Sequence, residues 1–215
     1  MRPALLVAAV ALLAAAAPAD ARFAADASSG DVIPSRDSVE RVPRAPGPRG
    51  TLVVVPGRSA VFGSGVVYRL AVEVEGGLRV DRNAFARRVT AILADRRSWG
   101  VAVQRVSSGP VDVRVTLASP GLTDYLCAPL LTNGIFSCGQ GGRAVLNADR
   151  WRHGAAAYGN DLRRYRIYMV NHEVGHLLGR GHASCPAAGA RAPVMLQQTK
   201  GVAPCRPNPW PLDWE

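Results

Sequence analysis

Residues 171–182 read NHEVGHLLGRGH and hold three of the four histidines in the chain. His172 and His176 are four residues apart, so on an α-helix their side chains project from the same face, about 6 Å apart along the axis. Neutral imidazole nitrogens suit Zn²⁺, and two imidazoles in this arrangement can share one ion. Glu173 lies beside the pair, where it can act as general base on a water bound to that ion. The spacing therefore predicts a metal site with a base next to it.

The third histidine of the stretch, His182, can bind the same ion only if the helix ends before it. On a continuous helix His182 would lie about 120° around the axis from His176 and could not reach the ion. Gly179 is placed to end the helix, because glycine adopts the left-handed conformation of a helix C-terminus at little cost. We therefore predict three protein ligands and one open coordination position, which is the arrangement of a catalytic zinc site.

The elements that would position these residues follow from hydrophobic periodicity. Residues 161–178 read DLRRYRIYMVNHEVGHLL and predict the helix that carries the first two histidines. An amphipathic helix is predicted over residues 82–97, capped by Asp81. Short or alternating apolar runs predict strands at residues 51–57, 66–75, 101–106, 111–117 and 143–148. We expect residues 119–142 to form a loop, and all residues after Gly179 to be irregular.

The first 50 residues are expected to lie outside the folded domain. Residues 1–21 have an early arginine, an apolar run and small residues near the end, which is the pattern of a secretory signal peptide. The apolar run at residues 4–17 is shorter than the roughly 20 residues of a membrane-spanning helix, although an uncleaved anchor is the alternative. Residues 22–50 are rich in Ala, Ser, Pro and charge, and are interpreted as a disordered linker or a short propeptide. Residues 51–215 then form one domain.

Four cysteines in an exported chain predict two disulfides. Cys127, Cys138, Cys185 and Cys205 allow three different connectivities. We favour the pairing of neighbours, Cys127 with Cys138 and Cys185 with Cys205, because it closes short loops. A cysteine-based metal site is not expected, since no pair has the C-x₂₋₄-C spacing of such sites.

The chain is strongly basic, with a formal net charge of +10 from 25 arginines, one lysine (Lys200) and 16 acidic residues. The arginines are scattered, which indicates a basic soluble surface; electrostatic contact with an anionic cell envelope is the functional alternative. We do not expect a nucleic-acid partner, because the chain is predicted to be exported and carries no recognition motif. No segment after the signal peptide is long and apolar enough to span a membrane, and we expect a monomer.

Residues 172–182, HEVGHLLGRGH, resemble the metzincin signature of zinc metallopeptidases, H-E-x-x-H-x-x-G-x-x-H followed by a Met-turn, at every fixed position. The resemblance implies that Met195, in the stretch APVM, forms the Met-turn, a hydrophobic floor under the metal. It also implies an α/β (α+β) fold with a mixed twisted sheet, a backing helix, the active-site helix and an irregular C-terminal subdomain. From about Leu52 onward, including the tail PNPWPLDW, the chain also resembles a family of uncharacterised secreted proteins from high-GC Gram-positive bacteria.

The function implied by this resemblance is that of a secreted zinc endopeptidase, with one catalytic Zn²⁺ and a protein or peptide substrate. The alternative, from another class, is a zinc-binding envelope or adhesion protein that does not cleave peptides. One departure from the metzincin pattern concerns the tyrosine that some members place after the Met-turn. No tyrosine follows Tyr168 here. The group that would stabilise the oxyanion is thus unassigned, with Tyr158 or a backbone amide as the alternatives.

Overall fold

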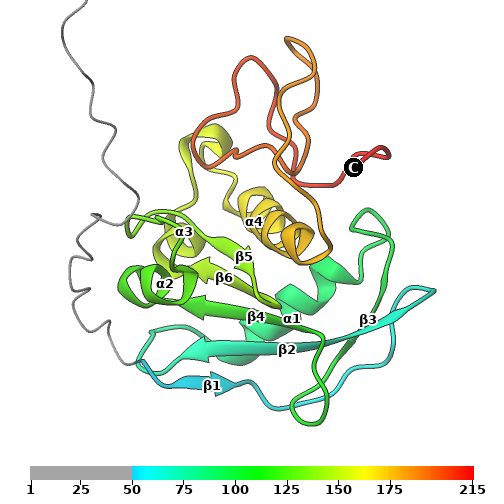
Figure 1. Cartoon of the computed structure of the whole chain (residues 1–215), viewed down its shortest axis with the longest axis vertical. Helices are drawn as coiled ribbons and strands as arrows, with labels where there is room; N and C mark the ends of the chain where they lie inside the picture. The colour runs from blue at the N-terminus through cyan, green and yellow to red at the C-terminus, as the bar shows by residue number, and fades with distance from the viewer. Residues whose placement is uncertain (1–49) are drawn as a thin grey trace, which may run out of the picture. The chain divides into compact units, whose positions relative to one another are not determined.

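The structure, a computed structural model, describes residues 50–215 (Figure 1). The predicted signal peptide, and residues 22–49 of the predicted linker or propeptide, lie outside the described residues. The elements in chain order are β1 (Leu52–Val54), β2 (Val67–Glu75), α1 (Arg82–Leu93), β3 (Ala102–Arg105), β4 (Val113–Ala118), α2 (Pro120–Cys127), β5 (Cys138–Gln140), β6 (Arg143–Asn147), α3 (Ala148–His153), the 3₁₀ turn η2 (Ala156–Tyr158) and α4 (Leu162–Leu177).

These strands form a six-stranded mixed sheet with the order β1-β2-β4-β6-β5, in which β3 pairs with β2. The β2–β3, β2–β4 and β4–β6 pairs are parallel, whereas β1 and β5 run antiparallel to their neighbours. Together with its helices, this mixed sheet confirms the predicted α/β (α+β) class. The five predicted strand regions each contain a strand, and β5 is an additional edge strand.

The core lies on both faces of the sheet. The main cluster joins alternate residues of β2, β4 and β6, such as Leu70, Val115 and Leu146, to α1 and α4. A smaller cluster on the other face packs α2 against Ala118 and Val145. Because both faces are covered, residues 70–75 of β2 are all buried, including those outside the predicted apolar face.

The buried carboxylate of Glu73 shows how a charge is accommodated on the second face. It accepts hydrogen bonds from Arg114 at 2.6 Å and from the Thr116 hydroxyl at 2.9 Å, and it is also paired with Arg143. A buried carboxylate is costly unless it is paired and hydrogen-bonded, and here two guanidinium groups and a hydroxyl from neighbouring strands meet that requirement. The network therefore joins β2, β4 and β6.

Two predictions about local structure were wrong. The expected loop at residues 119–142 contains α2 and β5; Ser119 caps α2 and Pro120 occupies its first turn, a position at which proline is favoured. The helix predicted to reach residue 97 ends at Leu93. Beyond it, the Asp95 carboxylate accepts a hydrogen bond from the Arg97 backbone amide at 2.9 Å, a local turn that competes with helix continuation.

The four cysteines form the two predicted disulfides. Cys127–Cys138 joins the end of α2 to β5, and Cys185–Cys205 joins two segments of the tail. The tail after Leu178, orange to red in Figure 1, contains no helix or strand, as predicted. No helix within residues 50–215 has both the length and the apolar character needed to cross a membrane.

Candidate metal centre

Helix α4 is the element that carries the first two histidines, and it matches the predicted helix closely. Asp161 caps its N-terminus by accepting a hydrogen bond from the Arg164 amide at 3.0 Å. The helix is buried along most of its length because it packs against β5, β6 and α1. Gly139 of β5 makes close packing possible, since a Cβ there would overlap the carbonyl oxygen of Glu173. The strand backbone therefore lies directly beside the part of the helix that carries His172 and His176.

The end of α4 turns the chain back at Gly179, as its sequence position predicts. Gly179 has φ +83°, a conformation that L side chains rarely adopt. Its amide donates to His176 O at 3.1 Å, and the next amide, of Arg180, donates to Gly175 O at 2.9 Å. These two bonds form the Schellman arrangement of a helix C-terminus. The chain after Gly179 can consequently reverse direction and bring His182 towards α4.

The three predicted ligands lie together. One ligand atom from each of His172, His176 and His182 falls within 4.8 Å of the others. The ring centroid of His182 lies 5.4 Å from that of His172 and 4.7 Å from that of His176. His172 is buried, His176 is partly buried and His182 is exposed, so the cluster opens to one side. Three imidazoles with an open side fit a tetrahedral ion that keeps one position free.

Hydrogen bonds orient two of the three rings. The Nδ1 atom of His172 lies 2.8 Å from Val194 O, and that of His176 lies 2.9 Å from Arg180 O. A carbonyl oxygen can only accept, so each Nδ1 carries the proton and each Nε2 keeps a free lone pair for a metal. Burial lowers the pKa of His172 to about 3 and also lowers the pKa values of His176 and His182. The neutral form that a ligand requires is therefore favoured.

Glu173, the predicted base, is buried next to these rings, and its burial raises the pKa of the carboxyl to about 8. The carboxyl and all three histidines line one cavity of about 370 Å³. Tyr168 of α4 also lines the cavity, and the other lining residues come from β5 and the segment before it, and from the tail: Leu130, Leu131, Thr132, Phe136, Ser137, Cys138, Gly139, Gln197, Thr199 and Lys200. The walls of the cavity thus combine apolar side chains with the polar side chains of Thr132, Ser137, Gln197, Thr199 and Lys200.

Met195 lies beneath this part of α4. It is buried, and a Cβ on Gly175 would lie 2.6 Å from its sulfur and 2.5 Å from the Trp99 ring. The Met195 carbonyl also accepts a hydrogen bond from the Ala183 amide at 3.1 Å, next to His182. The predicted Met-turn residue therefore contacts the helix of the first two histidines and is hydrogen-bonded to the chain that carries the third.

Glu215 holds the segment around Met195, a role that the sequence analysis missed. Its carboxylate accepts hydrogen bonds from the amides of Val194 at 2.9 Å, Met195 at 2.8 Å and Leu212 at 2.8 Å. The Val194 carbonyl is the one that orients His172. No local pattern could have indicated this contact, because the bonded residues are about 20 positions apart in sequence.

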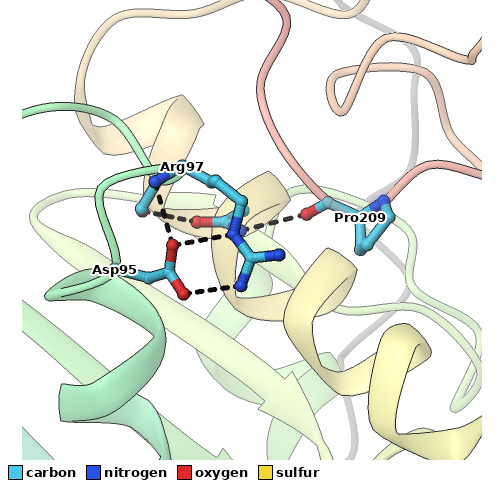
Figure 2. A network of polar contacts seen from close by, with 5 residues as sticks. Asp95, Arg97 and Pro209 are labelled. Carbon is cyan, nitrogen blue, oxygen red and sulfur yellow. Dashed lines mark hydrogen bonds and ion pairs between the residues drawn. The ribbon is translucent and has the colours of Figure 1, made fainter.

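Asn171, the residue before the first predicted ligand, also anchors α4. Its side-chain amide donates to Pro209 O at 3.0 Å, the contact drawn at Pro209 in Figure 2. Its side-chain oxygen accepts from the Ser98 hydroxyl at 2.7 Å. The Trp99 indole donates to the Asn171 carbonyl at 2.9 Å. The tail and the segment after α1 are thereby joined to the helix one residue before His172.

The hydroxyls of Tyr158 and Tyr168 are both engaged in hydrogen bonds, so neither is available as the oxyanion group in this structure. Tyr158 donates its hydroxyl to Gln198 at 2.9 Å and does not line the cavity. Tyr168 lines the cavity, but its hydroxyl donates to Leu196 O at 3.2 Å and accepts from the Gln198 amide at 2.9 Å. Both hydroxyls are thus hydrogen-bonded to residues of the tail.

Comparison with known proteins places the chain in a family. Residues 43–212 match the profile of the family described as Protein of unknown function (DUF3152), and the chain belongs to this family. No curated protein matches the chain. No solved structure matches it either.

Proposed function

We propose that this protein is a zinc-dependent endopeptidase of metzincin type that acts outside the cytoplasm. The observation that carries the proposal is the convergence of His172, His176 and His182 to within 4.8 Å, in a cavity that also contains the buried carboxyl of Glu173. Three imidazoles, one carboxyl that is not a ligand and one open side are the components of catalytic zinc sites.

The reaction would be hydrolysis of a peptide bond by a water molecule. A bound zinc ion would supply a Lewis acid that polarises the carbonyl and acidifies water. Burial favours the neutral form of Glu173, whereas the charge of a bound ion would favour its carboxylate. As a carboxylate, Glu173 would accept the proton of the attacking water and then deliver it to the leaving amine. The Nδ1 hydrogen bonds of His172 and His176 would keep their Nε2 atoms directed at the ion throughout.

An extended peptide would lie along β5, the edge strand at one end of the sheet. Cys138 and Gly139 of this strand line the cavity, so a peptide paired with the strand would pass the metal ligands. Main-chain hydrogen bonds to an edge strand bind peptides with little dependence on sequence. Protein or peptide substrates therefore suit the site.

The second candidate is a zinc-binding envelope protein that does not cleave peptides. Two observations favour it: the hydroxyls of Tyr158 and Tyr168 are both hydrogen-bonded to the tail, and the chain is strongly basic. Without a tyrosine hydroxyl to assist the ion in stabilising the oxyanion, the site would bind zinc but catalyse less well.

Two variants of the purified protein separate these functions. Glu173→Ala is expected to keep stoichiometric zinc and to reduce cleavage of a broad peptide library by about 10²–10⁴-fold, because the general base is lost. His182→Ala should weaken zinc binding, whereas His153→Ala, which changes the one histidine outside the cluster, should not. Wild-type protein that holds zinc but cleaves no peptide would favour the second candidate. Protein without zinc after mild purification would contradict both.

A further inference from the structure

A second cavity, larger than the metal cavity, lies on a different face of α4. Its volume is about 730 Å³, and it shares no lining residue with the metal cavity. Residues of α1 and of the first half of α4 form its walls, and Trp151 and Trp210 contribute to its lining. Five arginines line it: Arg87, Arg88, Arg97, Arg163 and Arg166. We call this cavity the arginine groove.

The carboxylates of the arginine groove neutralise only one of these arginines. Asp95 pairs with Arg97 through hydrogen bonds of 2.7 Å and 2.9 Å (Figure 2). The other acidic lining residue, Asp81, caps α1 by accepting from the Ala84 amide. Within residues 50–215, no carboxylate lies within ion-pair distance of the four remaining arginines of the groove. The groove therefore has an excess of positive charge.

Arg166 is held in place without a counterion. Its Nε donates to the Trp151 carbonyl at 2.8 Å, and its guanidinium lies 5.0 Å from the centroid of the Trp151 ring. Stacking on an aromatic ring leaves the in-plane N–H groups of a guanidinium available. Burial, and next the charge of Arg88, lower the pKa of Arg166. An anion beside Arg166 would stabilise the charged guanidinium and so offset both causes of the lowered pKa.

The positive surface continues beyond the groove. An adjoining cavity of about 330 Å³ shares Val80, Asp81, Trp151 and Arg166 with it and adds Arg79 and Arg152. Arg152 has one carboxylate, Asp149, at 3.8 Å. Guanidinium groups spread over two adjoining cavities match a ligand that carries several negative charges along its length, because a single small anion could neutralise only a few of them.

We propose that the arginine groove binds a linear phosphodiester polymer other than nucleic acid, with Arg88 and Arg166 at the centre of the contact. Guanidinium groups pair with phosphate oxygens through parallel N–H bonds, and one phosphate can accept from two arginines at once. Such binding does not depend on peptide hydrolysis, because the groove and the metal cavity share no lining residue.

The test measures binding of a fluorescent glycerol-phosphate oligomer to the full chain by anisotropy at several salt concentrations. We expect binding that weakens as salt rises, and an affinity lower by about 10-fold or more in Arg88→Gln/Arg166→Gln. The matched control is Arg191→Gln/Arg206→Gln, which removes the same charge from two exposed tail positions outside both cavities and should change affinity by less than about 3-fold. A second variant, Arg88→Gln/Arg163→Gln, changes two exposed residues only. A loss of affinity in this variant cannot be attributed to lost packing of Arg166 on Trp151.

Three results would overturn the proposal. Equal losses in the groove and control variants would mean that net charge alone attracts the polymer. Equal affinity for polygalacturonate, a carboxylate polymer, would mean that the groove does not select phosphate. Failure of the wild-type protein to bind the oligomer at low salt would exclude the site altogether.

Discussion

His172 reaches its position through a chain of hydrogen bonds that ends at Glu215. The ring bonds Val194 O, and the amides of Val194 and Met195 bond the Glu215 carboxylate. Outer partners of this kind set the orientation of a metal ligand and its lone pair. The geometry of the proposed metal site therefore depends on a residue that does not line the cavity.

This dependence predicts the effect of removing the Glu215 carboxylate. Glu215→Ala should lower zinc affinity, by less than the roughly 10–100-fold that follows the loss of a partner bonded directly to a ligand, because Glu215 acts through Val194. Glu215→Gln, which keeps one acceptor oxygen, should lower zinc affinity less. The affinities are measured by competition with a chromogenic chelator, with Asp213→Ala as the exposed control. Unchanged zinc affinity in a folded Glu215→Ala protein would contradict the role.

Gly179 provides a second prediction at the residue scale. Its φ of +83° makes any side chain unfavourable, so Gly179→Ala should lower the free energy of unfolding by about 1–2 kcal/mol. Gly181→Ala is the matched control, because Gly181 has open space around it and does not require a left-handed backbone. Urea denaturation of both variants measures the difference, and similar losses in the two would argue against the explanation.

At the scale of elements, α4 makes its contacts through a glycine in the middle of the helix. Gly175 lies against Trp99 and Met195, where a Cβ would come within 2.6 Å of both side chains. Glycine weakens a helix by about 1 kcal/mol relative to alanine, so its presence here reflects packing rather than propensity. The helix is thus adapted to the side chains beneath it.

Gly175→Ala should consequently destabilise the protein, although alanine is the better helix former. We expect a loss of about 1–3 kcal/mol from overpacking against Trp99 and Met195. Thermal and urea unfolding followed by circular dichroism would measure it. An increase in stability would show that propensity outweighs packing at this position.

At the scale of the whole molecule, two disulfides stabilise segments that have little regular structure around the site. Cys127–Cys138 closes a loop next to β5, and Cys185–Cys205 closes a loop that contains Met195. The sequence separations, 11 and 20 residues, give similar constraints on the unfolded chain. Covalent links of this kind suit a protein outside the reducing cytoplasm.

Replacing either pair with serine should lower the free energy of unfolding by about 3 kcal/mol, as expected for loops of this size. Only Cys185→Ser/Cys205→Ser is expected to weaken zinc binding as well, because that loop contains Met195 and begins three residues after His182. Urea unfolding and zinc competition, run on both double variants, test the two parts separately. Equal effects of both pairs on zinc affinity would contradict the second part.

Zinc itself should stabilise the folded protein by mass action. At a free zinc concentration 100-fold above the dissociation constant, the gain is about 2.7 kcal/mol. Removing zinc with a chelator should therefore lower the melting temperature of the wild-type protein and have little effect on His182→Ala. A melting temperature of the wild type that does not respond to zinc would mean that the histidine cluster does not hold the ion.

The sequence by itself determined the features that depend on near neighbours. Periodicity and backbone preference predicted most of the strands, the order of the elements and the glycine that ends α4. The spacing of His172 and His176 then placed both residues on one face of that helix. The α/β (α+β) class was implied by the resemblance to metzincins, and the order of the elements agrees with it. Helix α2 was missed although Ser119 and Pro120 form a local start signal, because the glycines and prolines around it predicted a loop.

Only the tertiary structure decided the features that join distant residues. The packing of Gly175 against Trp99, and the hydrogen bonds of Glu215, link segments that no local pattern relates. The arginine groove arises in the same way, since its arginines are scattered in sequence and come together only when α1 packs against α4. Local sequence specifies which groups are present, whereas burial and long-range contact specify which of them meet and which charges remain without a partner.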